Sequence, residues 1–139
     1  MKFYRQILVL FLSVLILSCS ESSQEELIKK AEAPLLEGLG SHIHKVTTNQ
    51  DSQIYFNQGL ILAFAFNHAE SIRSFKAAQR LDPNCAMCYW GEALSRGPNI
   101  NVTSDGKVVM SAQDRKEAYK AVGRAKELMS AATTKEQDY

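Results

Sequence analysis

Apolar side chains recur at the 3.6-residue spacing of an α-helix over most of the chain that follows residue 24. Residues that cap or break helices divide this pattern into segments. The segments that we expect to be helical are Asn49–Phe66, His68–Arg80, Cys85–Ser95 and Ala112–Ala132. The first of them is dense in apolar residues and should therefore be largely buried. Helices that follow one another through short connections predict an all-α fold.

A helical pattern also lies within Glu25–Glu37. Its apolar residues recur every four positions and are Leu27, Ala31 and Leu35. Pro34 argues against a helix in the later part, because proline removes a backbone donor and clashes with the preceding turn. The glycines within 38–40 should end the segment, and residues 41–46 should form extended chain.

Capping signals mark where the helices begin. A serine, threonine or asparagine three residues before an acidic residue has the spacing of a helix N-terminal cap. The pairs with this spacing are Thr48 with Asp51, Asn67 with Glu70, Ser111 with Asp114, and Thr133 with Glu136. The last pair indicates a further helix that begins near the end of the chain.

Proline and glycine mark where the helices end. Residues 82–84 (Asp-Pro-Asn) should end one helix and start the next, because proline is tolerated in a first helical turn. Gly97 and Pro98 should end the Cys85–Ser95 helix. Residues 99–110 should then form a loop, with a short hairpin at Asp105-Gly106.

A 34-residue helix-turn-helix period is the signature of the tetratricopeptide (TPR) repeat. If Pro83 is the proline of that repeat, the first unit begins at Ser52. The positions that the repeat fills with small, aromatic or aliphatic residues then hold Tyr55, Gly59, Ser71, Phe75, Ala78 and Leu81. Small residues let the two helices approach, and the aromatic residues fill the space that remains. Gln58 departs from the pattern, because an aliphatic residue is usual there.

A second unit follows, with Tyr89 at its aromatic position and Ala93 at its small position. Its second helix is displaced by 13 residues, which indicates an insertion at Gly97–Met110. The apolar stripe expected on that helix is Ala118, Val122, Ala125, Leu128 and Met129. The sequence therefore predicts a TPR-like solenoid of about two units, the second with an inserted loop.

The stretch from Phe66 to Asn101 resembles a subset of larger exported bacterial TPR proteins that have many repeats and no established activity. The resemblance implies that this chain is the N-terminal part of a longer protein or a truncated reading frame. It also implies a concave groove that binds a protein or peptide and is lined by the first helix of each unit. Two units without a polar capping helix leave an apolar end, so we expect the isolated chain to be marginally stable or to self-associate.

The first 18 residues have the pattern of a secretory signal: Lys2 and Arg5, then a short apolar core. Residues 16–19 (Ile-Leu-Ser-Cys) resemble the bacterial lipobox, which implies cleavage before Cys19 and its lipidation. The alternatives are an ordinary signal peptide or an uncleaved N-terminal anchor. Ser20 after the cysteine favours the outer membrane over the inner membrane. The resulting divisions are 1–18 signal, 19–24 lipidated cysteine and tether, 25–46 N-terminal segment, and 47–139 repeat region.

Charge excludes one class of partner. The chain has 16 basic and 15 acidic residues, and without residues 1–18 the balance is slightly negative. Such a chain lacks the basic footprint of a nucleic-acid-binding protein. The charged residues on Ala112–Ala132 have the pattern of a solvated helix face with local ion pairs: Lys116, Glu117, Lys120, Arg124, Lys126 and Glu127.

Cys85 and Cys88 form a C-x-x-C pair at an expected helix start. There a helix N-terminus lowers a thiol pKa, which suits redox chemistry. The simpler interpretation is two small buried residues at a repeat junction, joined in an oxidising compartment by a disulfide. Tyr89 follows the second cysteine, so the pattern excludes covalent haem attachment. Zinc would need two further ligands.

Other candidate side chains are few. His42 and His44 would share one face of an extended segment and are weak candidates for copper or zinc, with a solvated pair as the simpler interpretation. His68 should order the turn between two helices. An aromatic or amide ligand site is conceivable at Met87, Tyr89 and Trp90, or at 99–101, although core packing and loop ordering explain both.

The sequence contains no phosphate-binding loop, nucleophile elbow or zinc-protease motif. We therefore expect a non-enzymatic scaffold without a cofactor, anchored by lipid to the cell envelope, that binds a protein or peptide. The alternatives are a metal- or redox-active envelope module that uses Cys85 and Cys88, and the anchoring N-terminal fragment of a larger TPR protein.

Overall fold

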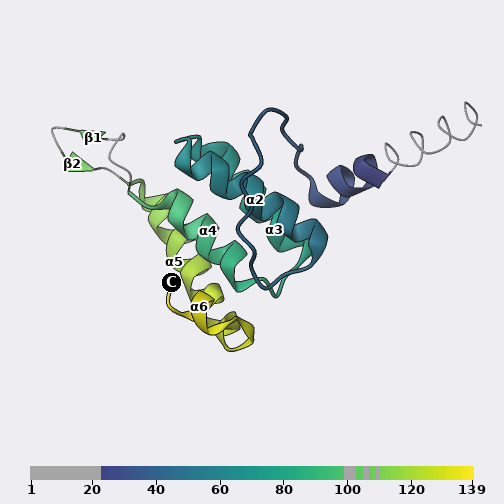
Figure 1. Cartoon of the computed structure of the whole chain (residues 1–139). Helices are drawn as coiled ribbons and strands as arrows, with labels where there is room; N and C mark the ends of the chain where they lie inside the picture. The colour runs from purple at the N-terminus through teal and green to yellow at the C-terminus, as the bar shows by residue number, and fades with distance from the viewer. Residues whose placement is uncertain (1–22, 99–102, 105–106, 109) are drawn as a thin grey trace, which may run out of the picture.

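The computed structural model of the chain describes residues 23–98, 103–104, 107–108 and 110–139. The fold is all-α, with a small hairpin between two of the helices (Figure 1). The predicted signal at 1–18, the lipidation site Cys19 and the amides of residues 99–101 lie outside the described residues. No helix of the described part is long and apolar enough to cross a bilayer.

Residues 23–31 are helical, and the helices that follow are α2 (Gln50–Phe64), α3 (His68–Leu81), α4 (Ala86–Arg96) and α5 (Ala112–Leu128). A 3-10 turn, η1 (Met129–Ala131), and a short helix, α6 (Thr134–Gln137), complete the chain. Strands β1 (Thr103–Ser104) and β2 (Lys107–Val108) form an antiparallel hairpin in the insertion between α4 and α5. The predicted helices are thus confirmed to within a few residues at each end.

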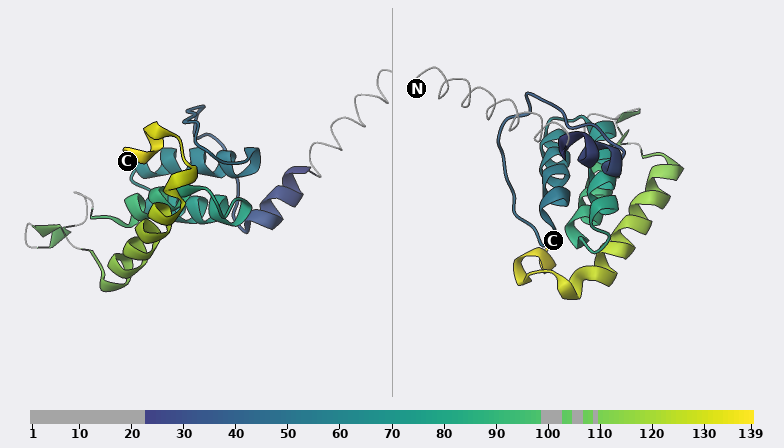
Figure 2. Two further views of the ribbon diagram at one scale, coloured as in Figure 1. Left: turned by 90° about the horizontal axis from the view of Figure 1, so that it is seen from below. Right: turned by 90° about the vertical axis from the view of Figure 1, so that its right-hand side faces the viewer.

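Consecutive helices pack against one another in chain order, so that α2–α3 and α4–α5 form two stacked helix pairs (Figures 1 and 2). The centre of the stack is Phe75 of α3, which is fully buried. A methyl carbon built on Gly59 of α2 would lie 3.1 Å from its ring, and one built on Gly91 of α4 would lie 2.5 Å from its Cζ. Both neighbouring helices therefore approach α3 closely through a glycine, and at Gly91 a side chain would require Phe75 or the helix to move.

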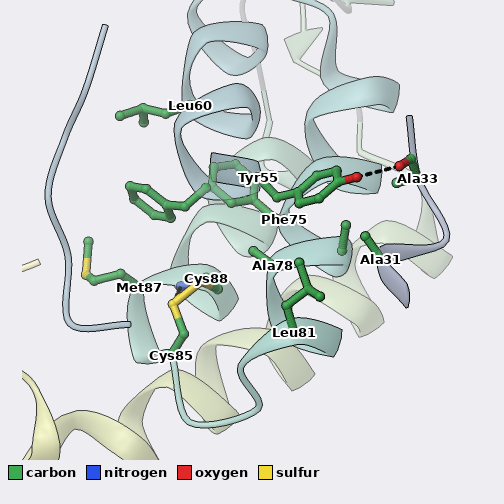
Figure 3. Packing of buried hydrophobic residues seen from close by; sticks show 12 residues of the cluster. Ala31, Ala33, Tyr55, Leu60, Phe75, Ala78, Leu81, Cys85, Met87 and Cys88 are labelled. Atoms are coloured by element: carbon green, nitrogen blue, oxygen red, sulfur yellow. Dashed lines mark hydrogen bonds between the residues drawn. A yellow bond between two sulfur atoms is a disulfide. The ribbon is translucent and has the colours of Figure 1, made fainter. Parts of the chain in front are cut away.

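The residues predicted to form the crossing of the first pair are confirmed. Tyr55, Phe75 and Ala78 are fully buried, and Leu81 is 7% exposed (Figure 3). Ser71 is fully buried as well. Ser71 Oγ donates to the carbonyl of Gly59 at 2.7 Å, so this small residue also satisfies a buried backbone group.

Gln58, the one departure from the repeat pattern, has a structural reason. Its Oε1 accepts from the backbone N–H of Leu36 at 2.8 Å, and its Nε2 donates to the carbonyl of Pro34 at 3.0 Å and to Ser74 Oγ at 2.9 Å. The carboxamide therefore satisfies backbone groups of a segment that an aliphatic side chain would leave without partners.

The N-terminal segment covers one side of the first helix pair. Its helix ends at Ala31, so the expectation of a helix over Glu25–Glu37 is wrong beyond that residue, as Pro34 indicated. The guanidinium of Arg80 donates to the Ala31 carbonyl, and Tyr55 Oη donates to the Ala33 carbonyl at 2.7 Å (Figure 3). These bonds hold the small side chains of the segment against α2 and α3.

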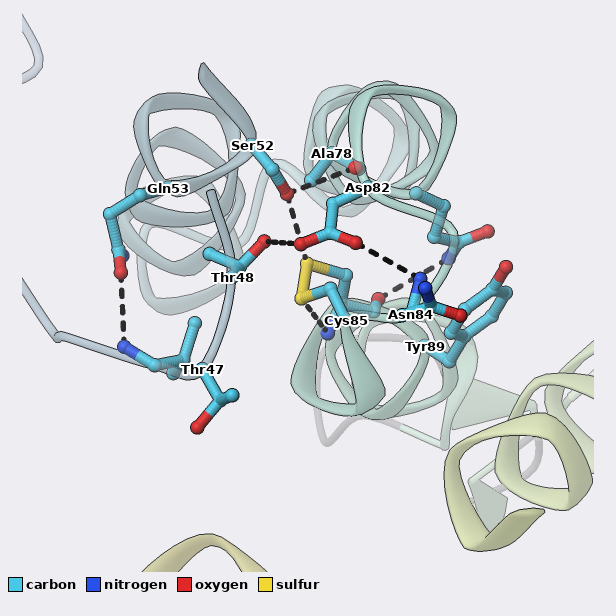
Figure 4. The surroundings of a disulfide bond; sticks show 12 residues. Thr47, Thr48, Ser52, Gln53, Ala78, Asp82, Asn84, Cys85 and Tyr89 are labelled. Carbon is cyan, nitrogen blue, oxygen red and sulfur yellow. Dashed lines mark hydrogen bonds between the residues drawn. A yellow bond between two sulfur atoms is a disulfide. The ribbon is translucent and has the colours of Figure 1, made fainter. Parts of the chain in front are cut away.

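The cap of α2 differs from the prediction. Asn49, not Thr48, is the N-cap, and its side chain accepts from the Ser52 N–H at 2.9 Å. Thr48 Oγ1 instead donates to Asp82 Oδ2 at 2.7 Å, at the end of α3 (Figure 4). The predicted caps Asn67, Ser111 and Thr133 are confirmed, and Thr133 forms a complete capping box with Glu136.

The apolar stripe of α5 is only partly covered. Its buried residue is Ala121, which the predicted stripe does not include, whereas Val122 is 43% exposed. Ala118, Ala125, Leu128 and Met129 are half-buried. Helix α4 covers the side of α5 centred on Ala121, and Val122, which is turned by 100° around the helix, lies at the edge of this contact and stays partly exposed.

Candidate binding groove

An apolar groove lies where the second helix pair meets the last turns of the chain, with a volume of about 240 Å³. Helix α4 contributes residues from successive turns on one of its faces, and α5 contributes the part of its apolar stripe that α4 leaves uncovered. The lining residues are Ala86, Met87, Trp90, Val122, Ala125, Lys126, Met129, Ala132, Glu136 and Tyr139. Trp90, Met87 and Met129 supply large apolar contacts of the kind that bind partner side chains.

Two aromatic rings form one wall of the groove. The rings of Trp90 and Tyr139 lie edge to face with centroids 5.2 Å apart, and Tyr139 also meets the ring of His44 at 6.4 Å. Tyr139 is 56% exposed, so this wall reaches the solvent. The groove is therefore open to a partner while its floor is apolar.

Glu136 holds α6, which forms a further wall of the groove, in place. Its carboxylate accepts from the N–H and the hydroxyl of Thr47, each at 2.6 Å, and from the N–H and hydroxyl of Thr133 at 2.8 and 2.6 Å. The end of the extended segment before α2 thereby lies beside α6 (Figure 2). This contact joins residues 89 positions apart in the sequence.

The charge of Glu136 is fixed by the same bonds. Burial raises the pKa of a carboxyl group, but the hydrogen bonds from Thr133 and Thr47 outweigh it and lower the pKa of Glu136 to about 2. The carboxylate is thus ionised at neutral pH, and its hydrogen-bonding capacity is used within the chain. The other charged residue in the lining is Lys126, which is exposed and forms no ion pair within the described residues.

A buried ion-pair network positions α5 against α4, and the sequence analysis missed it. Glu92, only 4% exposed, accepts from Arg96 Nε at 2.9 Å and from Gln79 Nε2 at 2.8 Å. Arg96 Nη1 reaches Asp114 in the first turn of α5 at 2.9 Å. The available signals were the i,i+4 spacing of Glu92 and Arg96, and the position of Glu92 exactly one 34-residue period after Gln58.

Cys85 and Cys88 are joined by a disulfide with Cα atoms 5.3 Å apart (Figure 4). Cys85 is the N-cap of α4, and its Sγ accepts from the Cys88 N–H at 3.1 Å. Both residues are fully buried, and Ser52 Oγ lies 3.5 Å from Cys88 Sγ. Because thiol–disulfide exchange requires access to a sulfur, this environment favours a structural disulfide over a redox centre.

The histidines are placed apart from the groove floor. His42 is exposed, and His44 is held by its backbone, which donates to Asn57 Oδ1 at 3.2 Å and accepts from Gln53 Nε2 at 2.8 Å. Among the residues that the structure describes, no three His, Cys, Asp or Glu side chains are grouped to hold a metal ion. The ring of His68 packs edge-on against Phe66 in the turn between α2 and α3, with centroids 6.3 Å apart.

The three residues predicted as a ligand site are divided by the fold. Met87 is buried and Trp90 half-buried, and both line the groove. Tyr89 points toward α5, where the guanidinium of Arg124 lies 6.0 Å from the centre of its ring. Arg124 also pairs with Glu127 at 2.9 Å, which confirms the expected ion pairing on this helix face.

Comparisons with known proteins found no matching family model, no matching curated protein and no matching solved structure.

Proposed function

We propose that the chain is a scaffold of the cell envelope that holds a partner protein in the groove between α4, α5 and α6. The observation that carries this proposal is the combination of an apolar lining with an opening to solvent. A folded chain gains free energy by covering such a surface, at about 25 cal/mol per Å² of apolar area removed from water.

The size of the groove favours a protein partner over a free metabolite. Small-molecule sites usually enclose about 300–1,000 Å³. The groove encloses about 240 Å³, which suits one or two apolar side chains presented by a larger molecule. Trp90 and Tyr139 are of the residue types that most often dominate binding energy at protein interfaces.

The stacked helix pairs and the sequence of the first 19 residues support the rest of the proposal. Helix pairs with glycine and serine at their crossings are the packing units of TPR proteins, which bind other proteins or peptides. A lipid on Cys19, close in sequence to the helical residues 23–31, would keep the groove near a membrane surface. Ser20, in place of an aspartate directly after Cys19, favours the outer membrane over the inner membrane.

Site-specific cross-linking in a bacterial host tests the scaffold role. A photoreactive p-benzoylphenylalanine replaces Val122 in the full chain, and in a matched variant it replaces Arg73, which is exposed on α3 away from the groove. We expect a discrete adduct at Val122 that is absent at Arg73. Ala125→Arg, whose long side chain fills the groove, should abolish the adduct. Adducts of equal yield at both positions, or an adduct insensitive to Ala125→Arg, would contradict the proposal.

A further inference from the structure

We infer that the partner's docking element is an acidic amphipathic helix that lies along the exposed face of α5 and inserts an apolar side chain into the groove. This inference rests on the proposed function and specifies the chemistry of the partner. It starts from the stripe on α5 that α4 leaves uncovered. Val122, Ala125 and Met129 recur at helical spacing and line the groove, and Val122 remains 43% exposed there.

The uncovered stripe continues along α5. Arg115, Tyr119, Val122 and Lys126 are spaced i, i+4, i+7 and i+11, which places them on one face of the helix. All four are exposed, and Tyr119 is 84% exposed. An apolar centre with a cation at each end is thus presented to solvent, next to the groove. We call these four residues the α5 face.

The positive charges of the α5 face favour a partner of negative charge. Neither Arg115 nor Lys126 forms an ion pair within the described residues. The carboxylate of Glu136 also lines the groove, but it belongs to α6 and not to the α5 face, and it is held there by hydrogen bonds from Thr47 and Thr133. A partner with carboxylates opposite the two cations would therefore meet complementary charge, and a basic partner would meet repulsion.

Gly123 shows where a partner helix can approach closely. It lies within α5 beside the α5 face, and a methyl carbon built on it would meet nothing within 4 Å. Glycine inside a helix costs about 1 kcal/mol relative to alanine, and no contact of the described chain requires it here. Glycines at Gly59 and Gly91, in contrast, each face an aromatic ring. A helix that approached α5 at this position would therefore meet no side chain.

The length of the α5 face sets the length of the partner. From Arg115 to Lys126 the helix rises by about 16 Å, which equals about three turns. A helix of this length is marginal alone in water, so the docking segment belongs to a folded partner or becomes helical on binding. Its charged residues would lie one at each end of those three turns, with a bulky apolar residue near the end that meets Lys126.

The single tryptophan of the chain reports on groove occupancy, because Trp90 lines the groove. The test uses the full chain in phosphatidylcholine nanodiscs and two designed helical peptides of about 18 residues, a length that forms helix more readily than a three-turn segment. They share one leucine stripe, and one carries glutamate where the other carries lysine. We expect the acidic peptide to change Trp90 emission saturably and to bind about tenfold more tightly than the basic peptide.

Variants of the chain test each part of the inference. Arg115→Glu with Lys126→Glu should reverse the preference between the two peptides, and Lys29→Glu, a control on the exposed N-terminal helix, should leave it unchanged. Gly123→Leu should weaken the binding of the acidic peptide about tenfold, because the added side chain blocks close approach of the peptide. The circular dichroism of the variant should show no loss of helix, because within the chain the added side chain meets open space.

Several results would overturn the inference. Equal binding of the two peptides, or an unchanged preference in the charge-reversed variant, would exclude charge selection. A Trp90 response to phosphatidylglycerol nanodiscs without peptide would identify the membrane as the occupant, and a concentration-dependent dimer abolished by Gly123→Leu would identify a second copy. Tighter binding of the basic peptide in the groove would overturn this inference alone, whereas the absence of a Val122 adduct in cells would overturn the proposed function.

Discussion

The stacking of the two helix pairs depends on the absence of a side chain at Gly91, and Gly91→Ala tests this dependence with one methyl group. The added carbon would lie 2.5 Å from Cζ and 2.6 Å from Cδ1 of Phe75. Favourable carbon contacts lie at about 3.5–4.0 Å, so the ring or the helix must move. Phe75 has little room to move away from the added carbon. A methyl carbon built on Gly59 would lie 3.1 Å from the Phe75 ring, and the centroid of the Phe56 ring lies 5.5 Å from that of Phe75.

Two opposing effects determine how far Gly91→Ala changes the free energy of unfolding. Overpacking a well-packed core by one methyl group costs about 1–3 kcal/mol, and the severity of this overlap places it near the upper end. Alanine has a higher helix propensity than glycine by about 1 kcal/mol, which offsets part of that cost. We therefore expect the free energy of unfolding to fall by about 2 kcal/mol in Gly91→Ala.

Gly123→Ala is the matched control, because the same substitution on the next helix meets nothing within 4 Å. Gly123→Ala should therefore stabilise the chain by about 1 kcal/mol, through the higher helix propensity of alanine alone. In Gly59→Ala the added carbon would lie 3.1 Å from the Phe75 ring, so its change in the free energy of unfolding should lie between those of Gly91→Ala and Gly123→Ala.

Urea denaturation followed by far-ultraviolet circular dichroism measures these differences. For a slope of about 1–3 kcal/mol/M, a loss of about 2 kcal/mol lowers the midpoint by about 1 M. If Gly91→Ala were as stable as Gly123→Ala, Phe75 would not be confined between two close helices, and the stacking of the pairs would be wrong.

The remaining predictions concern the contact of Glu136 with Thr47, the disulfide and the lipid anchor. Glu136 has its pKa lowered to about 2 in the folded chain, so its contribution to stability is present above its ordinary value of 4.5 and is lost as the pH falls toward 2. Glu136→Gln should therefore lower the urea midpoint at pH 7 and flatten its dependence on pH below 4.5. If the variant lost stability in acid as steeply as the original chain, the hydrogen bonds of Glu136 would not be the cause of that loss. The paired variant Cys85→Ser with Cys88→Ser should lower the free energy of unfolding by about 2 kcal/mol, the loop-closure value for so short a loop, and no thiol from this pair should react in the folded, oxidised chain. Cys19→Ser should abolish fatty-acid labelling and membrane fractionation in a bacterial host, whereas the paired serine variant keeps both; unchanged labelling in Cys19→Ser would remove the anchor from the account.

The sequence predicts well the features that depend on neighbouring residues or on a fixed period. Asn67, Ser111 and Thr133 are caps as expected, because a cap and its backbone partner lie three residues apart. Gly59 and Phe75 occupy the expected crossing, where the predicted pattern sets a small residue of one helix opposite an aromatic residue of the next.

Features that depend on distant residues escape such prediction. The contact of Thr47 with Glu136 spans 89 positions, and Arg80 reaches Ala31 across 49, so no local pattern reveals either. Periodicity also identifies an apolar stripe without saying which half is covered. On α5 the neighbour covers the side of Ala121 and leaves Val122 exposed, and that difference is what creates the groove. Thr48 and Asn49 both have cap chemistry, and Asp82 decides between them by binding the threonine.

Occupancy of the groove in the cell is the central claim, and cysteine accessibility measures it directly. Val122→Cys and the control Gln113→Cys, both exposed in the structure, are treated with a membrane-permeant maleimide in intact cells and after purification into nanodiscs. If a partner covers the groove, Val122→Cys is protected in cells and reactive after purification, while Gln113→Cys reacts equally in both. Equal reactivity of Val122→Cys in cells and in nanodiscs would show that nothing sits in the groove.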